Sequence, residues 1–284
     1  MAIHFAVVLA ALIFARKRRK TRWPFKDSEQ LLRGPGEGLR QKILALDESM
    51  QFEIFAAVVV QVTFSGLVYV VATNLGVSGG ARIVITLVAV LLVALVSAVR
   101  LVRIWKTRSG YVLGWYGERM AAEMLQPLQL QGYHVFHDVP AESGPKAFNI
   151  DHVVVGPTGV TAVEVKTRRK GNARPGYKEH DVSFDGSQLD WPWGYDRHGI
   201  EQAINEADWL AKWIHQRTGL KVAVKPVLTL PGWFVRESPS PKLRVVNPKI
   251  LPDVIRGRGE VTLTPQQVDL IARQLEVICR NVSE

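Results

Sequence analysis

The chain has 284 residues, 47% of them hydrophobic, and a formal net charge of +10 at pH 7. That length suits one or two domains. The charge alone does not indicate nucleic-acid binding, because residues 111–284 contain 21 Lys and Arg against 20 Asp and Glu. The basic excess lies in residues 16–51 and 100–110. Both segments flank apolar runs, where basic residues set membrane topology and favour anionic lipid headgroups.

The sequence contains one cysteine, Cys279. An internal disulfide is therefore excluded, which suits a reducing compartment. Cys279 follows the apolar residues Ile271, Leu275 and Ile278 at helical spacing. This pattern predicts a buried structural thiol rather than a reactive one.

Two apolar stretches, residues 52–73 and 82–99, are each close to the length that crosses a bilayer. The short, Gly-rich segment 74–80 joins them, so the two spans must be antiparallel. Residues 52–99 are therefore predicted to form a transmembrane helical hairpin.

Residues 1–15 are also apolar and are followed by the basic run Arg16–Lys20. The charge follows the apolar core, unlike the order in a cleaved signal peptide, so we expect an uncleaved N-terminal anchor. An interfacial helix is the alternative. The basic runs after residue 15 and after residue 99 both belong on the cytoplasmic side. We therefore expect a multi-pass protein of the bacterial inner membrane with its C-terminal domain in the cytoplasm.

Residues 16–51 are interpreted as a basic cytoplasmic linker. Within it, the break Gly34-Pro-Gly36 should end one short helix before another begins. The second helix is either amphipathic and lies on the membrane or serves as a juxtamembrane linker.

Residues 111–284 show the alternation of helix and strand patterns that is typical of a mixed α/β domain. The order is α-β-β-β-α-β, with a small hairpin predicted around Asp185-Gly186 and a final helix. The expected helices cover 116–130, 199–218 and 265–280, and the expected strands cover 133–139, 147–155, 160–167, 222–230 and 243–246.

Asp151, Glu164 and Lys166, in two of these strands, are the candidate catalytic residues. Glu164 and Lys166 are two positions apart, so they point to the same face of their strand. Asp151 interrupts the preceding apolar strand, and the tight turn at 156–159 can bring it beside Glu164. Neighbouring carboxylates repel one another, and a divalent cation removes that penalty. Mg²⁺ prefers such oxygen ligands, which predicts a Mg²⁺ (or Mn²⁺) site that could activate water at a phosphodiester.

This ordered set resembles the nuclease-related domain (NERD) family of the PD-(D/E)XK, restriction-endonuclease-like superfamily. The matching pieces cover roughly residues 114–232, and they are Gly117-Glu118, Ile150-Asp151-His152, Gly156-Pro-Thr-Gly159, Glu164-Val-Lys166 and Gln202-Ala203. The resemblance implies a restriction-endonuclease-like mixed-sheet fold after the transmembrane helices.

The resemblance also implies roles for individual residues. Asp151, Glu164 and the Val165 carbonyl would bind the metal, Lys166 would be the catalytic lysine, and Glu118 and Gln202 would support the site. Two features depart from the family pattern: Thr167–Lys170 stands where an aromatic residue is expected, and a long insertion reaches Asp196.

Simpler interpretations compete at several positions. Glu118 could interact with the dipole at a helix N-terminus, and Gln202 could be an ordinary polar helix residue. Trp191, Trp193 and Tyr195 could stack on bases or cover the sheet. A basic run beside the site could contact the phosphate backbone or form a solvated loop; its members are Arg168, Arg169, Lys170, Arg174 and Lys178.

The sequence therefore favours a membrane-anchored, metal-dependent nuclease that hydrolyses DNA. DNA is favoured over RNA, and a homodimer is an open alternative to a monomer. The alternative function is a non-catalytic protein that binds nucleic acid or acts as a scaffold at the membrane, which the near-neutral charge of residues 111–284 supports.

Overall fold

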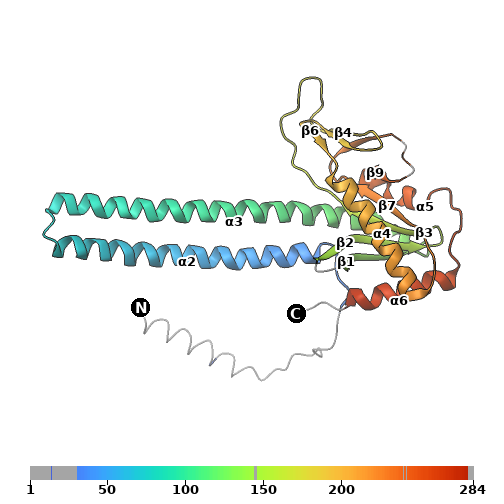
Figure 1. Cartoon of the computed structure of the whole chain (residues 1–284), viewed down its shortest axis with the longest axis horizontal. Helices are drawn as coiled ribbons and strands as arrows, with labels where there is room; N and C mark the ends of the chain where they lie inside the picture. Colours follow the sequence, from blue (N-terminus) through green and yellow to red (C-terminus); the bar gives the residue numbers. More distant parts are fainter. Residues whose placement is uncertain (1–13, 15–30, 144–145, 239, 241, 281–284) are drawn as a thin grey trace.

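The computed structural model describes residues 14, 31–143, 146–238, 240 and 242–280. Two long antiparallel helices project as a rod from one side of a mixed α/β domain (Figure 1). The predicted anchor at residues 1–15 lies outside the described residues apart from Phe14, and so does the basic run 16–20.

The rod consists of helix α2 (Glu37–Asn74) and helix α3 (Gly79–Gln129). Both helices are long and apolar enough to cross a membrane. Ala72 and Ala89 are the only buried residues within the two apolar stretches, while large side chains such as Phe55, Leu91 and Leu95 are exposed. The turn between the helices uses Gly76 with a positive φ of 70°, which glycine adopts without strain.

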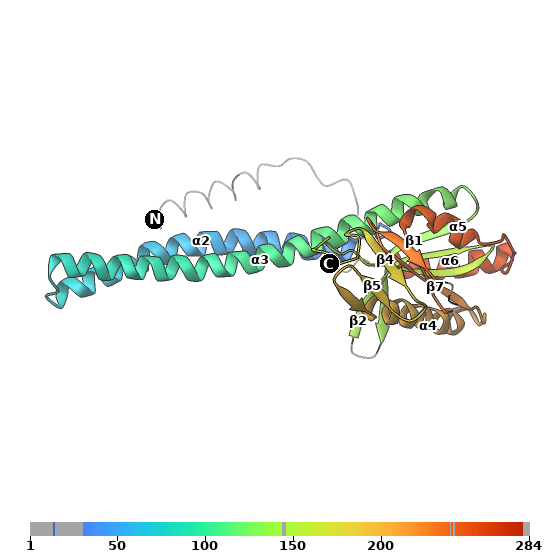
Figure 2. The ribbon, with the colours of Figure 1, turned by 90° about the horizontal axis from the view of Figure 1, so that it is seen from above.

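Each helix of the rod is longer than the apolar stretch within it. The Gly34-Pro-Gly36 break is present, and Gly36 is the N-cap of α2. Residues 37–51 then continue directly into the first apolar stretch instead of forming a separate helix. Likewise, the helix expected at 116–130 is the last part of α3. The second apolar stretch and the first helix of the domain are therefore parts of one continuous helix, α3 (Figure 2).

The two helices are tied together by polar contacts at and beyond the domain-side ends of the apolar stretches. Arg100 forms an ion pair with Glu53 at 2.9 Å, and Arg108 pairs with Asp47. The ammonium of Lys42 lies over the ring of Tyr111. These contacts fix the base of the rod, where it meets the domain.

The large sheet has the strand order β1-β2-β3-β7-β9. β1, β2 and β3 are antiparallel, whereas β3, β7 and β9 are parallel. All five strands expected from the sequence are present. Their bounds are β1 (His134–Ser143), β2 (Lys146–Gly156), β3 (Gly159–Val165), β7 (Val224–Thr229) and β9 (Arg244–Val246).

Helices cover both faces of this sheet. On one face, α4 (His198–Thr218) and α6 (Pro265–Arg280) pack against Val153, Val155 and Ala162. On the other, the end of α3 and the short helix α5 (Leu251–Arg256) pack against Val154 and Val163. Figure 2 shows α3 and α4 on opposite sides of the strands. Cys279, expected to be buried, is 1% exposed in the α6 core.

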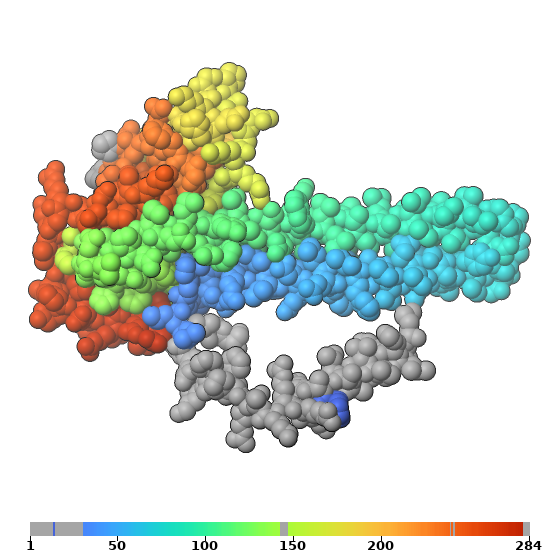
Figure 3. All heavy atoms as spheres, turned by 180° about the vertical axis from the view of Figure 1, so that it is seen from behind, coloured from blue at the N-terminus to red at the C-terminus, as the bar shows by residue number. Residues whose placement is uncertain are grey.

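A second, smaller sheet with the order β6-β5-β4-β8 rises beside the rod (Figure 3). The hairpin predicted around Asp185-Gly186 is β4 (Asp181–Phe184) and β5 (Leu189–Trp191). Strands β6 (Gly194–Asp196) and β8 (Phe234–Glu237) were not predicted from the sequence, and they are only three and four residues long. The chain is thus a mixed α/β protein with two mixed sheets.

A short segment before α2 fastens the rod to the domain. Arg33 Nε donates to Asp138 Oδ2 at 2.8 Å, and the Gly38 N–H donates to the same oxygen at 2.9 Å. Asn149 Nδ2 donates to the other oxygen at 2.8 Å. These donors hold Asp138 at an unusual positive φ of 49°. Because the Arg33 N–H also donates to the Cys279 carbonyl, the segment bridges β1 and α6.

We predict that Arg33→Ala lowers the free energy of unfolding by about 3 kcal/mol, because it leaves a buried carboxylate without its cation. The side chains of Arg33 and Asp138 are only 9% and 6% exposed. Unfolding of the full chain in detergent micelles by guanidinium, followed by tryptophan fluorescence, measures the change.

Arg40→Ala is the matched control, because Arg40 is 57% exposed and pairs with Glu37 on the same helix. Its expected cost is about 0–1 kcal/mol. Equal losses from the two variants would contradict a structural role for the Arg33–Asp138 pair.

Candidate functional site

Asp151 in the middle of β2, Glu164 near the end of β3 and Lys166 just after it lie together on the face that α4 covers. Asp151 Oδ2 accepts a hydrogen bond from the Val165 N–H at 2.7 Å, so the carboxylate is held against the next strand. Lys166 Nζ forms an ion pair with Glu164 Oε1 at 2.5 Å. The period of two in β3 places Glu164 beside Val160 and Ala162 on this face. The structure thus brings together the three residues that the sequence analysis chose.

Helix α4 adds two polar residues to this group. Gln202 Oε1 accepts from Lys166 Nζ at 2.7 Å, and Gln202 Nε2 donates to Glu206 Oε1 at 2.8 Å. Gly199, near the start of α4, allows the helix to approach Lys166 closely, because a Cβ at this position would lie 3.0 Å from the Lys166 Cγ. The helix can therefore begin directly over the lysine stem.

Glu206 was missed by the sequence analysis. It follows Gln202 by four residues, so it lies on the same face of α4. It also lies beside Ala203, Ala207 and Leu210, which form the buried stripe of this helix. The signal in the sequence that could have identified Glu206 is an acidic residue inside the apolar stripe of a helix.

Glu118 enters the site from α3, on the other side of the sheet. It is 6% exposed and lies in the interior of the helix, far from Ser78 at its N-terminus. The alternative role at a helix N-terminus is therefore wrong. The neighbouring Gly117 allows α3 to approach, because a Cβ there would lie 2.1 Å from the Thr167 methyl group. The Gly36 backbone, in the segment before α2, also lies close enough to Glu118 to lower its pKa.

The carboxyl groups of this site destabilise one another in their charged forms. Burial first, and then the charges of Asp138 and Glu164, raises the pKa of Glu118 to about 8. Burial and the Glu164 charge raise the pKa of Glu206 to about 9. Burial first, and then the charges of Glu164, Glu118 and Glu206, raises the pKa of Asp151 well above its ordinary range.

Lys166 is the cation within this group. Burial alone lowers the pKa of Lys166, but the Glu164 carboxylate outweighs that effect and the pKa is raised. The lysine is therefore charged at neutral pH, and one positive charge faces several carboxyl groups.

The donor set suits a hard divalent cation. Three buried carboxylate oxygens have no hydrogen-bond partner within the described chain: Oε2 of Glu118, Glu164 and Glu206. Oxygen ligands of this kind are those that Mg²⁺ prefers, and a cation offsets the repulsion that raises their pKa values. Among the described residues, no group of three or more His, Cys, Asp or Glu side chains already converges as a metal site. The chemistry of the donors nevertheless fits a hard cation.

The basic run beside the site holds the insertion in place. Arg168 pairs with Asp196 at 2.8 Å, and Arg174 pairs with Asp190 at 2.5 Å. Arg169 donates to the Ser109 hydroxyl at 2.6 Å, which ties the insertion to α3. Lys170 lies over the Trp233 ring, and Lys178 is exposed. These arginines have structural partners, and a role of the run in nucleic-acid binding stays a prediction.

The aromatic residues of the insertion divide between core and surface. Trp191 is 2% exposed and packs against Trp233, so it covers the apolar interior of the small sheet. Trp193 stacks on Trp191 and is 41% exposed, and Tyr195 is 62% exposed. Of these three residues, Trp193 and Tyr195 are therefore exposed to solvent.

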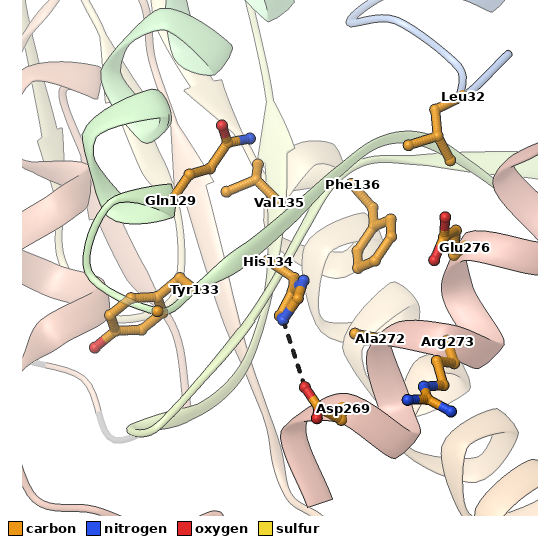
Figure 4. Close-up of a pocket in the computed structure, with 11 residues that line it drawn as sticks. Leu32, Gln129, Tyr133, His134, Val135, Phe136, Asp269, Ala272, Arg273 and Glu276 are labelled. Atoms are coloured by element: carbon orange, nitrogen blue, oxygen red, sulfur yellow. Dashed lines mark ion pairs between the residues drawn. The ribbon is translucent and has the colours of Figure 1, made fainter. Parts of the chain in front are cut away.

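Two pockets lie on different sides of the domain. One lies at the far edge of the large sheet, where His134 on β1 points toward Asp269 on α6 at 3.9 Å (Figure 4). It contains none of the site residues. A second pocket runs along α4 and is lined by Gln202, Glu206, Phe148 and Trp209 among others. The second pocket therefore reaches the α4 side of the carboxylate site, at Gln202 and Glu206.

The raised pKa values predict that stability falls as pH rises from 7 to 9 when no metal is present. A carboxyl group with an ordinary pKa of 4.5 has lost its proton in the unfolded chain at pH 7, whereas Glu118 and Glu206 keep theirs in the folded chain. Unfolding then releases protons, so rising pH favours the unfolded state.

Thermal unfolding of the full chain in detergent with EDTA tests this prediction. The window begins at pH 7 because His137 and His152, whose burial lowers their pKa values, act in the opposite direction at lower pH. Glu206→Gln should flatten the upper part of the curve. Stability that increases from pH 7 to 9 would contradict the prediction.

Comparison with known proteins was informative for one region of the chain. Among curated proteins, none matches the sequence. The family model described as nuclease-related domain matches residues 113–231, which is less than half of the chain. The matched region includes the end of α3, strands β1 to β7 and α4, and with them every side chain of the carboxylate site. Residues 113–231 therefore match the nuclease-related domain family.

Proposed function

We propose that this chain is a membrane-anchored, metal-dependent nuclease that hydrolyses DNA phosphodiester bonds on the cytoplasmic side of the bacterial inner membrane. The observation that carries the proposal is the cluster of Asp151, Glu164 and Lys166 in the region that matches the nuclease-related domain. Buried oxygens of Glu118, Glu164 and Glu206 beside it lack hydrogen-bond partners within the described chain. We also place the domain in the PD-(D/E)XK, restriction-endonuclease-like superfamily, on the order of these residues in two antiparallel strands.

The carboxylates of Asp151 and Glu164, with the Val165 carbonyl, are the proposed ligands of Mg²⁺ or Mn²⁺. Such an ion would supply Lewis-acid chemistry at the scissile phosphate and lower the pKa of a bound water. Lys166 carries its charge at neutral pH, because its pKa is raised. It therefore serves to stabilise the negative charge that develops on the phosphate rather than as a general base.

The membrane location rests on the two exposed apolar helices of the rod. Trp105 is 58% exposed, and it lies between the exposed basic residues Arg103 and Lys106, just beyond the second apolar stretch. Tryptophan and basic residues together are typical of the cytoplasmic headgroup region. This arrangement supports a hairpin that leaves and re-enters the cytoplasmic side.

We predict that Lys166→Ala lowers cleavage of DNA by about 10²–10³-fold, the usual effect of removing one group that stabilises the transition state. The assay uses the full chain in detergent with plasmid, linear and single-stranded DNA and with RNA, in Mg²⁺, Mn²⁺ or EDTA. EDTA should abolish cleavage.

The exposed Lys249, outside the matched region, provides the control variant Lys249→Ala, which should cleave as the unchanged chain does. Undiminished cleavage by Lys166→Ala would exclude the assigned site. Nucleic-acid binding without cleavage under any of these conditions would favour the alternative, a non-catalytic binding protein.

The proposed topology predicts which residues a membrane-impermeant maleimide reaches in intact cells. Ser78→Cys, in the turn between α2 and α3, should be labelled from outside. Ser187→Cys, in the exposed turn of the small sheet, should be labelled only after permeabilisation. The buried Cys279 gives little background, and unmodified chain is the control. Labelling of Ser187→Cys in intact cells would show that the domain faces outward.

A further inference from the structure

Glu206 stands at the end of a chain of hydrogen bonds that leads to the proposed catalytic lysine. Its side chain accepts from Gln202 Nε2 at 2.8 Å, and Gln202 Oε1 accepts from Lys166 Nζ at 2.7 Å. Lys166 Nζ also contacts Glu164 Oε1 at 2.5 Å. The lysine ammonium is thus held from two sides, by Glu164 on β3 and by the Gln202 amide on α4.

The direction of the Gln202 amide decides whether it can hold the lysine. The two ends of an amide differ, because its nitrogen only donates and its oxygen only accepts. Turned by 180°, Gln202 would present its NH₂ group to the lysine ammonium, and two donors would face each other. An acceptor on the nitrogen side favours the observed orientation, and a carboxyl group provides one whether it is ionised or carries its proton on its other oxygen. Glu206 Oε1 is this acceptor.

Packing alone does not explain an acidic residue at this position. Glu206 is 3% exposed, and its neighbours on the buried stripe of α4 are Ala203, Ala207 and Leu210. An apolar side chain of similar size would fill the position without the cost of burying a carboxyl group. We propose that Glu206 is a positioning residue, which fixes the Gln202 amide and through it places the Lys166 ammonium.

The effect of Glu206 on cleavage rests on the proposed nuclease function, whereas its effect on the position of Lys166 does not. The first experiment therefore measures the lysine directly. The full chain in detergent, without metal, is treated with acetic anhydride, and the rate of acetylation at Lys166 is followed by mass spectrometry.

Three variants separate the explanations. Glu206→Met keeps the length of the side chain but cannot accept, and it should speed acetylation of Lys166 by about tenfold, the factor associated with losing one hydrogen bond. Glu206→Gln keeps a carbonyl acceptor and should stay within about twofold of the unchanged chain. Glu201→Met, at an exposed position of the same helix, is the matched control and should have no effect.

Gln202→Met removes the next hydrogen bond in the series, the one to Lys166, and should also speed acetylation of Lys166. It replaces Glu206→Met as the test if thermal unfolding shows that Glu206→Met does not fold. Acetylation of Lys166 at an unchanged rate in folded Glu206→Met, or in Gln202→Met, would overturn the inference.

Cleavage by the same variants provides the second test. Glu206→Met should lower kcat by about 10-fold or more, Glu206→Gln should restore it, and Glu206→Met should add nothing to Gln202→Met in the double variant. A Glu206→Gln variant as inactive as Glu206→Met would show that the carboxylate itself is required, and the positioning role would be wrong. If the unchanged chain cleaves no nucleic acid, the proposed function fails, and the acetylation rates still decide the role of Glu206.

Discussion

Four carboxyl groups around one half-buried ammonium form the constraint on which the site depends. Glu118, Asp151, Glu164 and Glu206 come from four elements, and Lys166 is the cation among them. Burying this many acidic groups is unfavourable, because each loses its hydration and repels its neighbours. Protons relieve the repulsion in the absence of a cation. The same excess of acidic groups over cations is what the proposed divalent ion would offset.

The helices that bring these groups together also tie them to the rod. Glu118 is carried by α3, the helix whose other half contains the second apolar stretch. Arg33, before α2, reaches Asp138 on β1, and Asp138 lies close enough to raise the pKa of Glu118. Glu118 and Asp138 therefore belong both to the base of the rod and to the surroundings of the carboxylate site. The unit that must fold together begins before α2, outside the region that matches the nuclease-related domain.

The sequence allowed prediction of those parts of the site that follow from local geometry. Residues two apart in a strand share a face, so Glu164 and Lys166 could be paired, and the turn at 156–159 set Asp151 beside them. Glu206 was missed because single acidic residues in a helix usually face solvent. The continuity of α3 was missed because a basic segment after an apolar stretch is compatible with either a linker or a helix. The Arg33–Asp138 pair joins residues 105 positions apart, and no local pattern predicts such a contact.

A continuous helix rather than a flexible linker determines where the site lies relative to a membrane. Residues 99 and 118 both belong to α3, and a helix rises about 1.5 Å per residue, so Glu118 lies about 28 Å along the axis from the end of the apolar stretch. A flexible linker would allow a range of heights. Here Arg169, bonded to Ser109, and Arg33, bonded to Asp138, brace the domain against the rod from two sides. On the proposed topology, the site is therefore held at one height, and only nucleic acid drawn close to the membrane comes within its reach.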